Sequence, residues 1–434
     1  MSSGNPYVLI VDSHSSANKG DAAILQALIE SLTRELPDAI FKVHSTYPSV
    51  AAAMHHIPAS PPLVNRPHRR LAYMPIVFKM LLFFVLGVGY RWGLNLQRLL
   101  PNRGIFARYK DFLEADLVVG MGGGFYNDNY DRSLPGRLFH LWLGKILQKP
   151  VVISAHSIGP FKRPFYRWLA GFVFRQLDLI CLRDSESLPQ LALMNVSEAK
   201  VQVVADSAWL LQPASIERAQ NILQLEKVPN SKPLVSVALL RWRLFQTKPW
   251  LEGHQQYLKT VVEVLGNLIR CHNCHVVFLS TNTNLGGHPT DDRQTAREAL
   301  ALMDPALIEH TTIIDGEYRP EELKALYGQV ALHIGTRMHS VILAAAMQTP
   351  VIGIAYEFKM FGVMRSLGLG EYVCDIENIT LDDLWGKVDA AFKKRESLRR
   401  KIARALPTLQ AQARRNAQLI AGVLQAKKET WPRF

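Results

Sequence analysis

Residues 330–362 constrain the fold most, because they contain one complete strand–helix–strand unit. The apolar run 330–334 is typical of a buried strand, and a helical pattern follows from about 338 to 347. Pro350 ends the helix, and residues 351–355 predict a second buried strand. Strands joined by one crossover helix run parallel, so the chain contains a parallel α/β sheet.

Polar side chains gather where these two strands end. Arg337 and His339 lie between the first strand and the helix, and Glu357 and Lys359 follow the second strand. In an open parallel sheet both places lie at the carboxyl edge, where ligands bind. A helix N-terminus adds backbone N–H groups and the positive end of a dipole. We therefore predict a pocket for a small, multiply charged anion; helix capping plus surface charge is the alternative.

The same alternation recurs along the chain, which at 434 residues is too long for one ordinary core. Two doubly wound, Rossmann-like α/β domains are predicted, facing each other across a cleft. The Pro-rich loop 229–233 separates domain 1–228 from domain 229–380, and a basic helical tail, 381–434, is expected to pack across both. Further strands are predicted at 7–11, 117–120, 151–155, 178–182, 201–204, 234–239, 276–280 and 311–314.

The loop after the first strand carries Asn18, Gly20 and Asp21. Gly20 would let the backbone approach a ligand, and Asn18 and Asp21 would bond sugar hydroxyls. Asp21 is equally well explained as a helix-start residue. Both interpretations stay open.

Two more strand ends carry candidate binding groups. Gly122, Gly123 and Gly124 predict a backbone nest for a phosphate or a sugar. Their spacing is not the dinucleotide fingerprint, which disfavours a Rossmann oxidoreductase. Arg183 follows the strand 178–182 and is either directed into the cleft or held in a structural ion pair.

The net charge of +13 and the pI near 9.6 favour anionic partners. No nucleic-acid signature accompanies the charge, so nucleic-acid binding is not expected. The first strand begins at residue 7 without a basic, apolar leader, and the four cysteines fit a reducing compartment. We therefore expect a cytoplasmic protein; the sequence does not indicate its oligomeric state.

The insert 71–100 is the most apolar part of the chain. Its uncharged run 80–90 is too short to span a membrane, but Lys79 and Arg91 bracket it. This combination predicts a segment lying in a membrane interface, with the protein at the inner face of the membrane. The alternative is a buried helix of the first domain. Further arginines flank the run: Arg69, Arg70, Arg98 and Arg103.

Several short motifs occur in order over nearly the whole chain. They are Asn18-x-Gly20-Asp21, Gly122-Gly123-Gly124, Ser157-x-Gly159-Pro160, Arg183-Asp184-Ser185-x-Ser187, Arg337-x-His339 and Tyr356-Glu357-x-Lys359. In this the chain resembles the polysaccharide pyruvyl transferase family. It is most similar to colanic-acid-type members, through Asp291-Asp292-Arg293 and Asp206-x-Ala208-Trp209.

The resemblance implies a fold like that of GT-B glycosyltransferases. It also implies transfer of the pyruvyl group of phosphoenolpyruvate to two hydroxyls of one sugar, in a polysaccharide or its lipid-linked precursor. The products would be a cyclic ketal and phosphate. Phosphoenolpyruvate would be a co-substrate, and no cofactor or metal is expected.

Each candidate site residue can be assigned a role in this reaction. Arg337, Lys359 and Arg183 would hold the anionic donor, and His339 would contact it and transfer a proton. The base for the sugar hydroxyl is left open among Asp21, Glu357, Asp184 and His156. The expected acceptor side comprises Asn18, Gly20, Gly122, Gly123, Gly124, His156 and Ser157.

Two other functions remain open on the sequence. A nucleotide-sugar-dependent GT-B glycosyltransferase would share the fold and the basic cleft. A non-catalytic, membrane-associated scaffold of polysaccharide assembly would need no cluster of Arg337 and His339.

Overall fold

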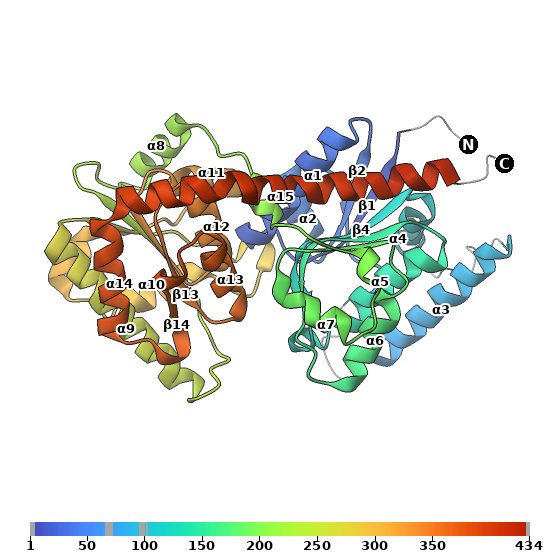
Figure 1. The fold of residues 1–434 in the computed structure, drawn as a ribbon, viewed down its shortest axis with the longest axis horizontal. Helices are drawn as coiled ribbons and strands as arrows, with labels where there is room; N and C mark the ends of the chain where they lie inside the picture. Colours follow the sequence, from blue (N-terminus) through green and yellow to red (C-terminus); the bar gives the residue numbers. More distant parts are fainter. Residues whose placement is uncertain (1–4, 66–72, 95–99, 101–102, 431–434) are drawn as a thin grey trace. The chain divides into compact units, whose positions relative to one another are not determined.

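The computed structural model describes residues 5–65, 73–94, 100 and 103–430, which form two compact units (Figure 1). The N-terminal unit comprises the described residues within Met1–Ser16, Ile24–Leu210 and Ala411–Phe434. The C-terminal unit comprises Ala17–Ala23 and Leu211–Gln410. Each unit is built around its own parallel sheet.

The sheet of the N-terminal unit has eight strands in the described residues, in the order β3-β2-β1-β4-β6-β7-β8, with β5 paired to β6. Every pairing is parallel. The order reverses direction between β1 and β4, as in doubly wound folds. The strands are β1 (Tyr7–Ser13), β2 (Ile40–Ser45), β3 (Ala59–Ser60), β4 (Leu117–Gly120), β5 (Gly123–Tyr126), β6 (Val151–Ile158), β7 (Leu179–Leu182) and β8 (Val201–Val203).

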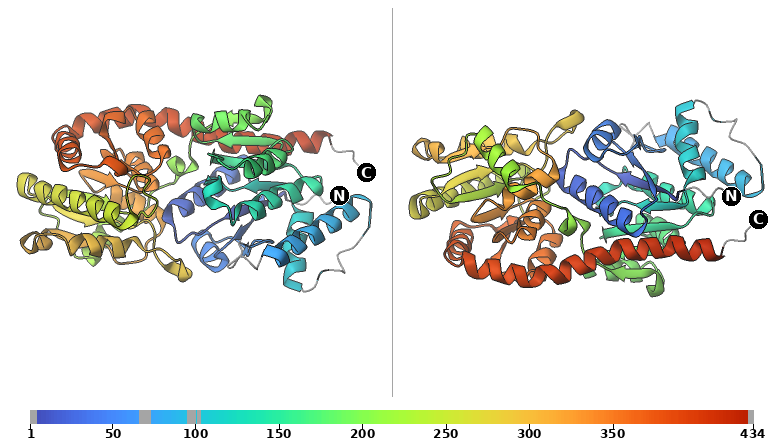
Figure 2. Two further views of the ribbon diagram at one scale, coloured as in Figure 1. Left: turned by 90° about the horizontal axis from the view of Figure 1, so that it is seen from below. Right: turned by 90° about the horizontal axis from the view of Figure 1, so that it is seen from above.

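Helices cover both faces of this sheet (Figure 2). The core between them is apolar and continuous, because β1, β4 and β6 are buried on both faces and each contains a run of valine, leucine or isoleucine, at residues 8–11, 117–119 and 151–153. The helices are α1 (Lys19–Glu35), α2 (Pro48–His55), α3 (Tyr73–Arg91), α4 (Arg103–Glu114), α5 (Leu134–Ile146), α6 (Pro164–Phe174) and α7 (Leu188–Ala192).

The sheet of the C-terminal unit has six parallel strands in the described residues, in the order β11-β10-β9-β12-β13-β14. This is the 3-2-1-4-5-6 order of a Rossmann fold, and its switch point lies between β9 and β12. There Gly335 pairs with Ala238 at the carboxyl ends of the two strands. The strands are β9 (Leu234–Ala238), β10 (His275–Phe278), β11 (Thr311–Ile313), β12 (Leu332–Gly335), β13 (Val351–Ala355) and β14 (Val373–Asp375).

Helices also cover both faces of the second sheet (Figure 2). The last helix, α15, belongs to the C-terminal unit up to Gln410 and to the N-terminal unit from Ala411. The helices are α8 (Ile216–Leu225), α9 (Trp250–His272), α10 (Asp292–Leu300), α11 (Pro320–Tyr327), α12 (Met338–Ala346), α13 (Phe358–Ser366), α14 (Leu381–Lys393) and α15 (Arg395–Thr430).

The predicted fold class, two doubly wound parallel α/β domains, is confirmed. The boundary predicted after residue 228 falls inside the C-terminal unit, because α8 is tied to α11. Arg218 on α8 pairs with Glu322 at 2.7 Å, and the Ala214 N–H donates to the Glu321 carbonyl. The strands β2, β3, β5 and β14 were not predicted.

The apolar run 80–90 lies within helix α3, which is longer than the run, at 19 residues. The segment Met74–Arg91 is long and apolar enough to cross a membrane by length and composition, so the length argument against a span was wrong. One side of α3 nevertheless lies in the core, where Phe83 stacks on Tyr109 at 5.7 Å and Leu86 is buried. Arg69, Arg70, Arg98 and the insert positions 71–72 and 95–99 lie outside the described residues.

Candidate functional site

The carboxyl ends of β12 and β13 are each followed directly by a helix. Helix α12 begins after Arg337 and helix α13 begins after Glu357, and neither of these residues caps its helix with its side chain. Elsewhere in this unit, Asp291 caps α10 and Thr380 caps α14 through side-chain oxygens. The first turns of α12 and α13 therefore present backbone N–H groups at the switch-point edge, an arrangement suited to an anion.

Arg337 is held in place by Asp292, the first residue of α10. Its Nη2 donates to Asp292 Oδ1 at 2.6 Å and its Nε donates to Oδ2 at 3.1 Å. Burial opposes the charge of Arg337, but the adjacent Asp292 carboxylate more than offsets it and raises the pKa of the guanidinium. Arg337 is thus fixed as a cation by a two-point contact with one carboxylate.

The start of α1 belongs to this unit and lies beside His339. The Lys19 N–H donates to the Thr281 carbonyl at 2.7 Å, and Asn18 forms a β-bridge with Asn282. A Cβ atom added to Gly20 would come within 2.4 Å of His339 Nδ1. The backbone at Gly20 therefore approaches the imidazole of His339 so closely that no larger residue fits without displacing it.

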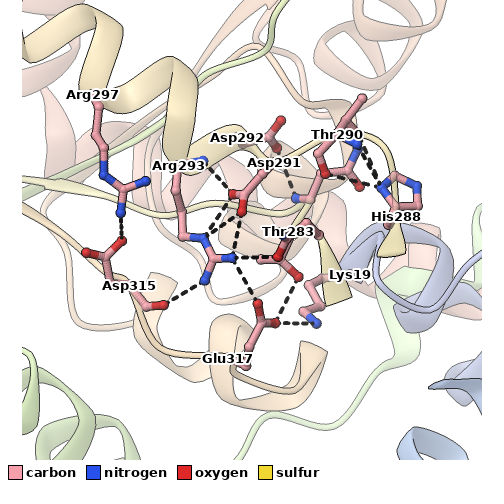
Figure 3. A network of polar contacts seen from close by, with 12 residues as sticks. Lys19, Thr283, His288, Thr290, Asp291, Asp292, Arg293, Arg297, Asp315 and Glu317 are labelled. Atoms are coloured by element: carbon pink, nitrogen blue, oxygen red, sulfur yellow. Dashed lines mark hydrogen bonds and ion pairs between the residues drawn. The ribbon is translucent and has the colours of Figure 1, made fainter. Parts of the chain in front are cut away.

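A chain of charged groups lies next to Asp292 (Figure 3). Lys19, almost fully buried, pairs with Glu317 at 3.3 Å, and Arg293 pairs with the same carboxylate at 3.2 Å and with Asp291 at 2.6 Å. Burial lowers the pKa of Lys19 despite the opposing effect of Glu317. The network fixes the start of α1 against the loop after β10, and so fixes Gly20 beside His339.

Three further predicted residues of this unit, Tyr356, Glu357 and Lys359, follow the end of β13. Lys359 pairs with Glu357 at 3.3 Å, and both side chains are partly buried. Tyr356 packs on Trp242, from the loop after β9, with ring centroids 4.5 Å apart. Asp21 lies half-buried in the first turn of α1.

Arg183 lies in the N-terminal unit, in a buried ion pair. Its Nη1 contacts Asp206 at 2.6 Å, and its Nε donates to Ser157 Oγ at 2.8 Å. The Ser157 hydroxyl also donates to Asp184, whose other oxygen accepts from the Ser187 N–H and caps the turn that follows. These contacts are those of a structural ion pair, which was one of the two roles predicted for Arg183. Its other role, binding of the donor, stays a proposal.

The glycine run 122–124, predicted as a nest, leads into β5. Gly123 and Gly124 belong to β5, where Gly123 pairs with His156 and has a φ of +153°. A Cβ on Gly122 would meet the Ala155 carbonyl at 3.1 Å. These glycines therefore allow β5 to lie close to β6. His156 is fully buried, with its ring 4.4 Å from that of Tyr126.

A family model described as polysaccharide pyruvyl transferase matches residues 18–357. The chain belongs to the polysaccharide pyruvyl transferase family. The match begins at Asn18, beside the Gly20–His339 contact, and ends at Glu357, at the start of α13. The family resemblance of the sequence is confirmed, and with it the general activity of a transferase.

The chain is similar in sequence to one relative and in fold to two solved structures. It is 28% identical over 414 residues to the amylovoran biosynthesis protein AmsJ of Erwinia amylovora, covering 92% of this chain and 95% of that protein. It shares its fold with a glycosyltransferase from Rickettsia africae, with a TM-score of 0.60, 12% identity, and 97% and 99% of the two chains covered. A putative UDP-N-acetylglucosamine 2-epimerase from Listeria monocytogenes gives a TM-score of 0.62 at 12% identity, with 99% and 98% covered. The predicted GT-B-like fold is confirmed.

Sequence reasoning missed the residues that hold this candidate site together. Lys19 and Glu317 were not singled out, and Asp292 was noted only within a family motif. Asp292 follows Asp291, which is the true cap of α10. The pair of successive aspartates could have indicated the contact of Asp292 with Arg337 from the sequence. Only one of them is needed to cap the helix, so the other can pair with a cation. Among the described residues, no group of three or more His, Cys, Asp or Glu side chains is placed to hold a metal.

Proposed function

We propose that this family member transfers the pyruvyl group of phosphoenolpyruvate to two hydroxyls of one sugar, in a polysaccharide or its lipid-linked precursor. The acceptor class is supported by the family and by the relative named for amylovoran biosynthesis. The donor is supported by the cluster of Arg337, His339 and Lys359 at the first turns of α12 and α13.

Donor binding rests on the charge and hydrogen-bond donors of that cluster. Phosphoenolpyruvate carries a carboxylate and a phosphate, and two neighbouring helix N-termini offer each of them backbone N–H groups. Asp292 engages two N–H groups of Arg337; a guanidinium has five, so the others would bind one anionic group of the donor. Lys359 would bind the second group, exchanging its contact with Glu357 for the donor.

The proposed reaction balances without a further reactant. A proton is added to the methylene carbon of phosphoenolpyruvate, and a sugar hydroxyl attacks the neighbouring carbon as that carbon becomes cationic. The C–O bond to phosphate breaks, and the second hydroxyl closes the ring. The two sugar hydroxyls release two protons. One returns to the group that protonated the methylene carbon, and the other is taken up by the departing phosphate.

His339 is the proposed proton donor, because an imidazole can donate and accept a proton and this one lies in the first turn of α12, just past the carboxyl end of β12. The proposed base is Asp21 or Glu357, which lie in the same unit as His339. His156 suits this role less well, because its ring is fully buried against aromatic side chains.

The decisive experiment measures phosphate release from phosphoenolpyruvate in the presence of isolated lipid-linked saccharides. We expect acceptor-dependent release in the wild type and none in His339→Ala, which should remain folded because the residue is only partly buried. His310→Ala, in the same unit, is the control and should keep normal turnover. A folded His339→Ala enzyme with normal turnover contradicts the role of His339. Release of UDP from a UDP-sugar, without phosphate from phosphoenolpyruvate, contradicts the proposed reaction.

A further inference from the structure

Helix α3 exposes an apolar stripe on the side opposite its buried face. Met74, Phe78 and Leu81 are 82%, 69% and 57% exposed, and Val77 and Val85 lie on the same side. These positions recur every three to four residues, so they form one continuous stripe along the helix. A soluble surface helix normally carries polar groups here.

Helix α6 carries a second apolar stripe, which was not predicted. Phe165 and Trp168 are each 62% exposed, and Phe172 is 37% exposed. The opposite side of α6 is buried through Ala170, Val173 and Phe174. Like α3, this helix is anchored in the core of the N-terminal unit by one face and leaves aromatic side chains in solvent on the other.

Contacts between aromatic rings join the two stripes across α5. Phe84 of α3 stacks on Trp142 of α5 with centroids 5.4 Å apart, and Trp142 contacts Phe172 of α6 at 5.6 Å. Phe172 stacks on Trp168 at 6.2 Å, and Trp168 stacks on Phe165 at 6.3 Å. The exposed residues of α3 and α6 therefore form one surface, called here the α3–α6 surface. An exposed apolar patch of this kind marks an interaction site.

The charged side chains on α3 and α6 themselves have one sign. Neither α3 nor α6 contains an aspartate or a glutamate. The basic residues on the two helices and beside α6 are Lys79, Arg91, Lys162, Arg163, Arg167 and Arg175. Arg163 pairs with Asp131, and the net charge of the set remains positive.

We propose that the α3–α6 surface binds the interface of an anionic lipid bilayer. Tryptophan and phenylalanine side chains enter the boundary between headgroups and acyl chains, and surrounding lysines and arginines contact anionic headgroups. A second copy of this chain would place the same positive charges against each other, which disfavours self-association here. Because Phe83 and Leu86 hold α3 in the core, the helix lies along the membrane and does not cross it.

The test uses the whole protein with vesicles of phosphatidylglycerol and phosphatidylcholine. Phe165→Ser/Trp168→Ser removes the two most exposed rings of α6 without touching the core. Ile216→Ser/Leu225→Ser, on α8 of the C-terminal unit, is the matched control, because those residues are 64% and 71% exposed. We expect the wild type and the control to sediment with anionic vesicles and detach at high salt. The α6 variant should bind these vesicles at least about tenfold more weakly than the wild type.

Each outcome decides the proposal without reference to catalysis. No sedimentation of the wild type at low salt, or equal binding by both double variants, overturns it. A wild-type dimer in analytical ultracentrifugation that becomes a monomer only in the α6 variant, with no vesicle binding, assigns the surface to a second copy. Retention of the wild type on vesicles after a high-salt wash and alkaline extraction contradicts peripheral binding.

Discussion

At the residue scale, the contact between Gly20 and His339 links two motifs that are far apart in the sequence. Glycine at this position was expected to let the backbone approach a ligand. What it admits is the imidazole of His339, because an added Cβ would overlap Nδ1, Cγ and Cβ of that side chain. The orientation of His339 therefore depends on the absence of a side chain at residue 20.

Gly20→Ala tests this dependence. Alanine favours a helix over glycine, so the start of α1 should not be destabilised by the change itself. The new methyl group must instead displace His339, and a displacement of about 1 Å at a reacting group costs on the order of a hundredfold in rate. We expect a folded protein with phosphate release reduced about ten- to a hundredfold. Gly386→Ala, on α14 with nothing near the added Cβ, is the control and should keep full activity.

The position of the ring can also be followed without turnover. The imidazole nitrogen resonances of His339 should shift in Gly20→Ala and stay unchanged in Gly386→Ala. Unaltered His339 resonances with unaltered turnover would mean that Gly20 has no positioning role.

At the scale of elements, the site is made by helix starts brought to one edge of the second sheet. The sequence predicted the β12-α12-β13 unit well, because the whole unit is contiguous and its strands are buried on both faces. It did not predict that α10 supplies Asp292 to Arg337, since that pairing depends on the β9–β12 order of the sheet. It did not predict β5 either, because this strand begins with Gly123 and Gly124, which have no hydrophobic pattern and become a strand only by pairing with β6.

Asp292→Ala tests the buried pair that fixes Arg337. Asp292 is 4% exposed and Arg337 is 16% exposed, so removing the carboxylate leaves a poorly solvated cation. Such a loss costs about 3–5 kcal/mol of unfolding free energy. Asp315→Ala is the matched control, because Asp315 pairs with Arg297 in solvent at 58% and 54% exposure and should cost about 0–1 kcal/mol. Urea denaturation of the two variants gives the comparison.

A double variant separates the cost of an unpaired charge from the cost of lost packing. Asp292→Ala/Arg337→Met removes both charges and keeps an aliphatic chain in place of the arginine stem. It should recover part of the stability lost in Asp292→Ala. Equal stability of Asp292→Ala and Asp315→Ala would show that Arg337 does not depend on its carboxylate partner.

At the scale of the whole molecule, neither unit is continuous in sequence. The C-terminal unit takes in Ala17–Ala23, and the N-terminal unit takes in the end of the chain from Ala411. Composition and periodicity report only on local segments, so they predict two domains and a tail packing across both, but not that Ala17–Ala23 belong to the C-terminal unit. The place of the chain end in the N-terminal unit has a specific chemical basis at Asn416, which is 1% exposed.

Asn416 is expected to hold the end of α15 on β6 by hydrogen bonds. Its Oδ1 accepts from the Ala155 N–H at 3.2 Å, and its Nδ2 donates to Ser154 Oγ at 2.9 Å. Asn416→Leu leaves two buried polar groups without these partners, at about 1–3 kcal/mol each. Gln418→Leu, an exposed position two residues along the same helix, is the control and should change stability by less than about 0.5 kcal/mol.

Hydrogen exchange reads this effect in the N-terminal unit alone. Peptides covering residues 151–158 should exchange markedly faster in Asn416→Leu than in the wild type or in Gln418→Leu, because the Ala155 amide loses its acceptor. Exchange over residues 332–335 of β12 should be the same in all three proteins, since that strand belongs to the other unit. Unchanged protection of residues 151–158 in Asn416→Leu would show that apolar packing of Ala413, Ala417 and Ile420 suffices to hold the helix.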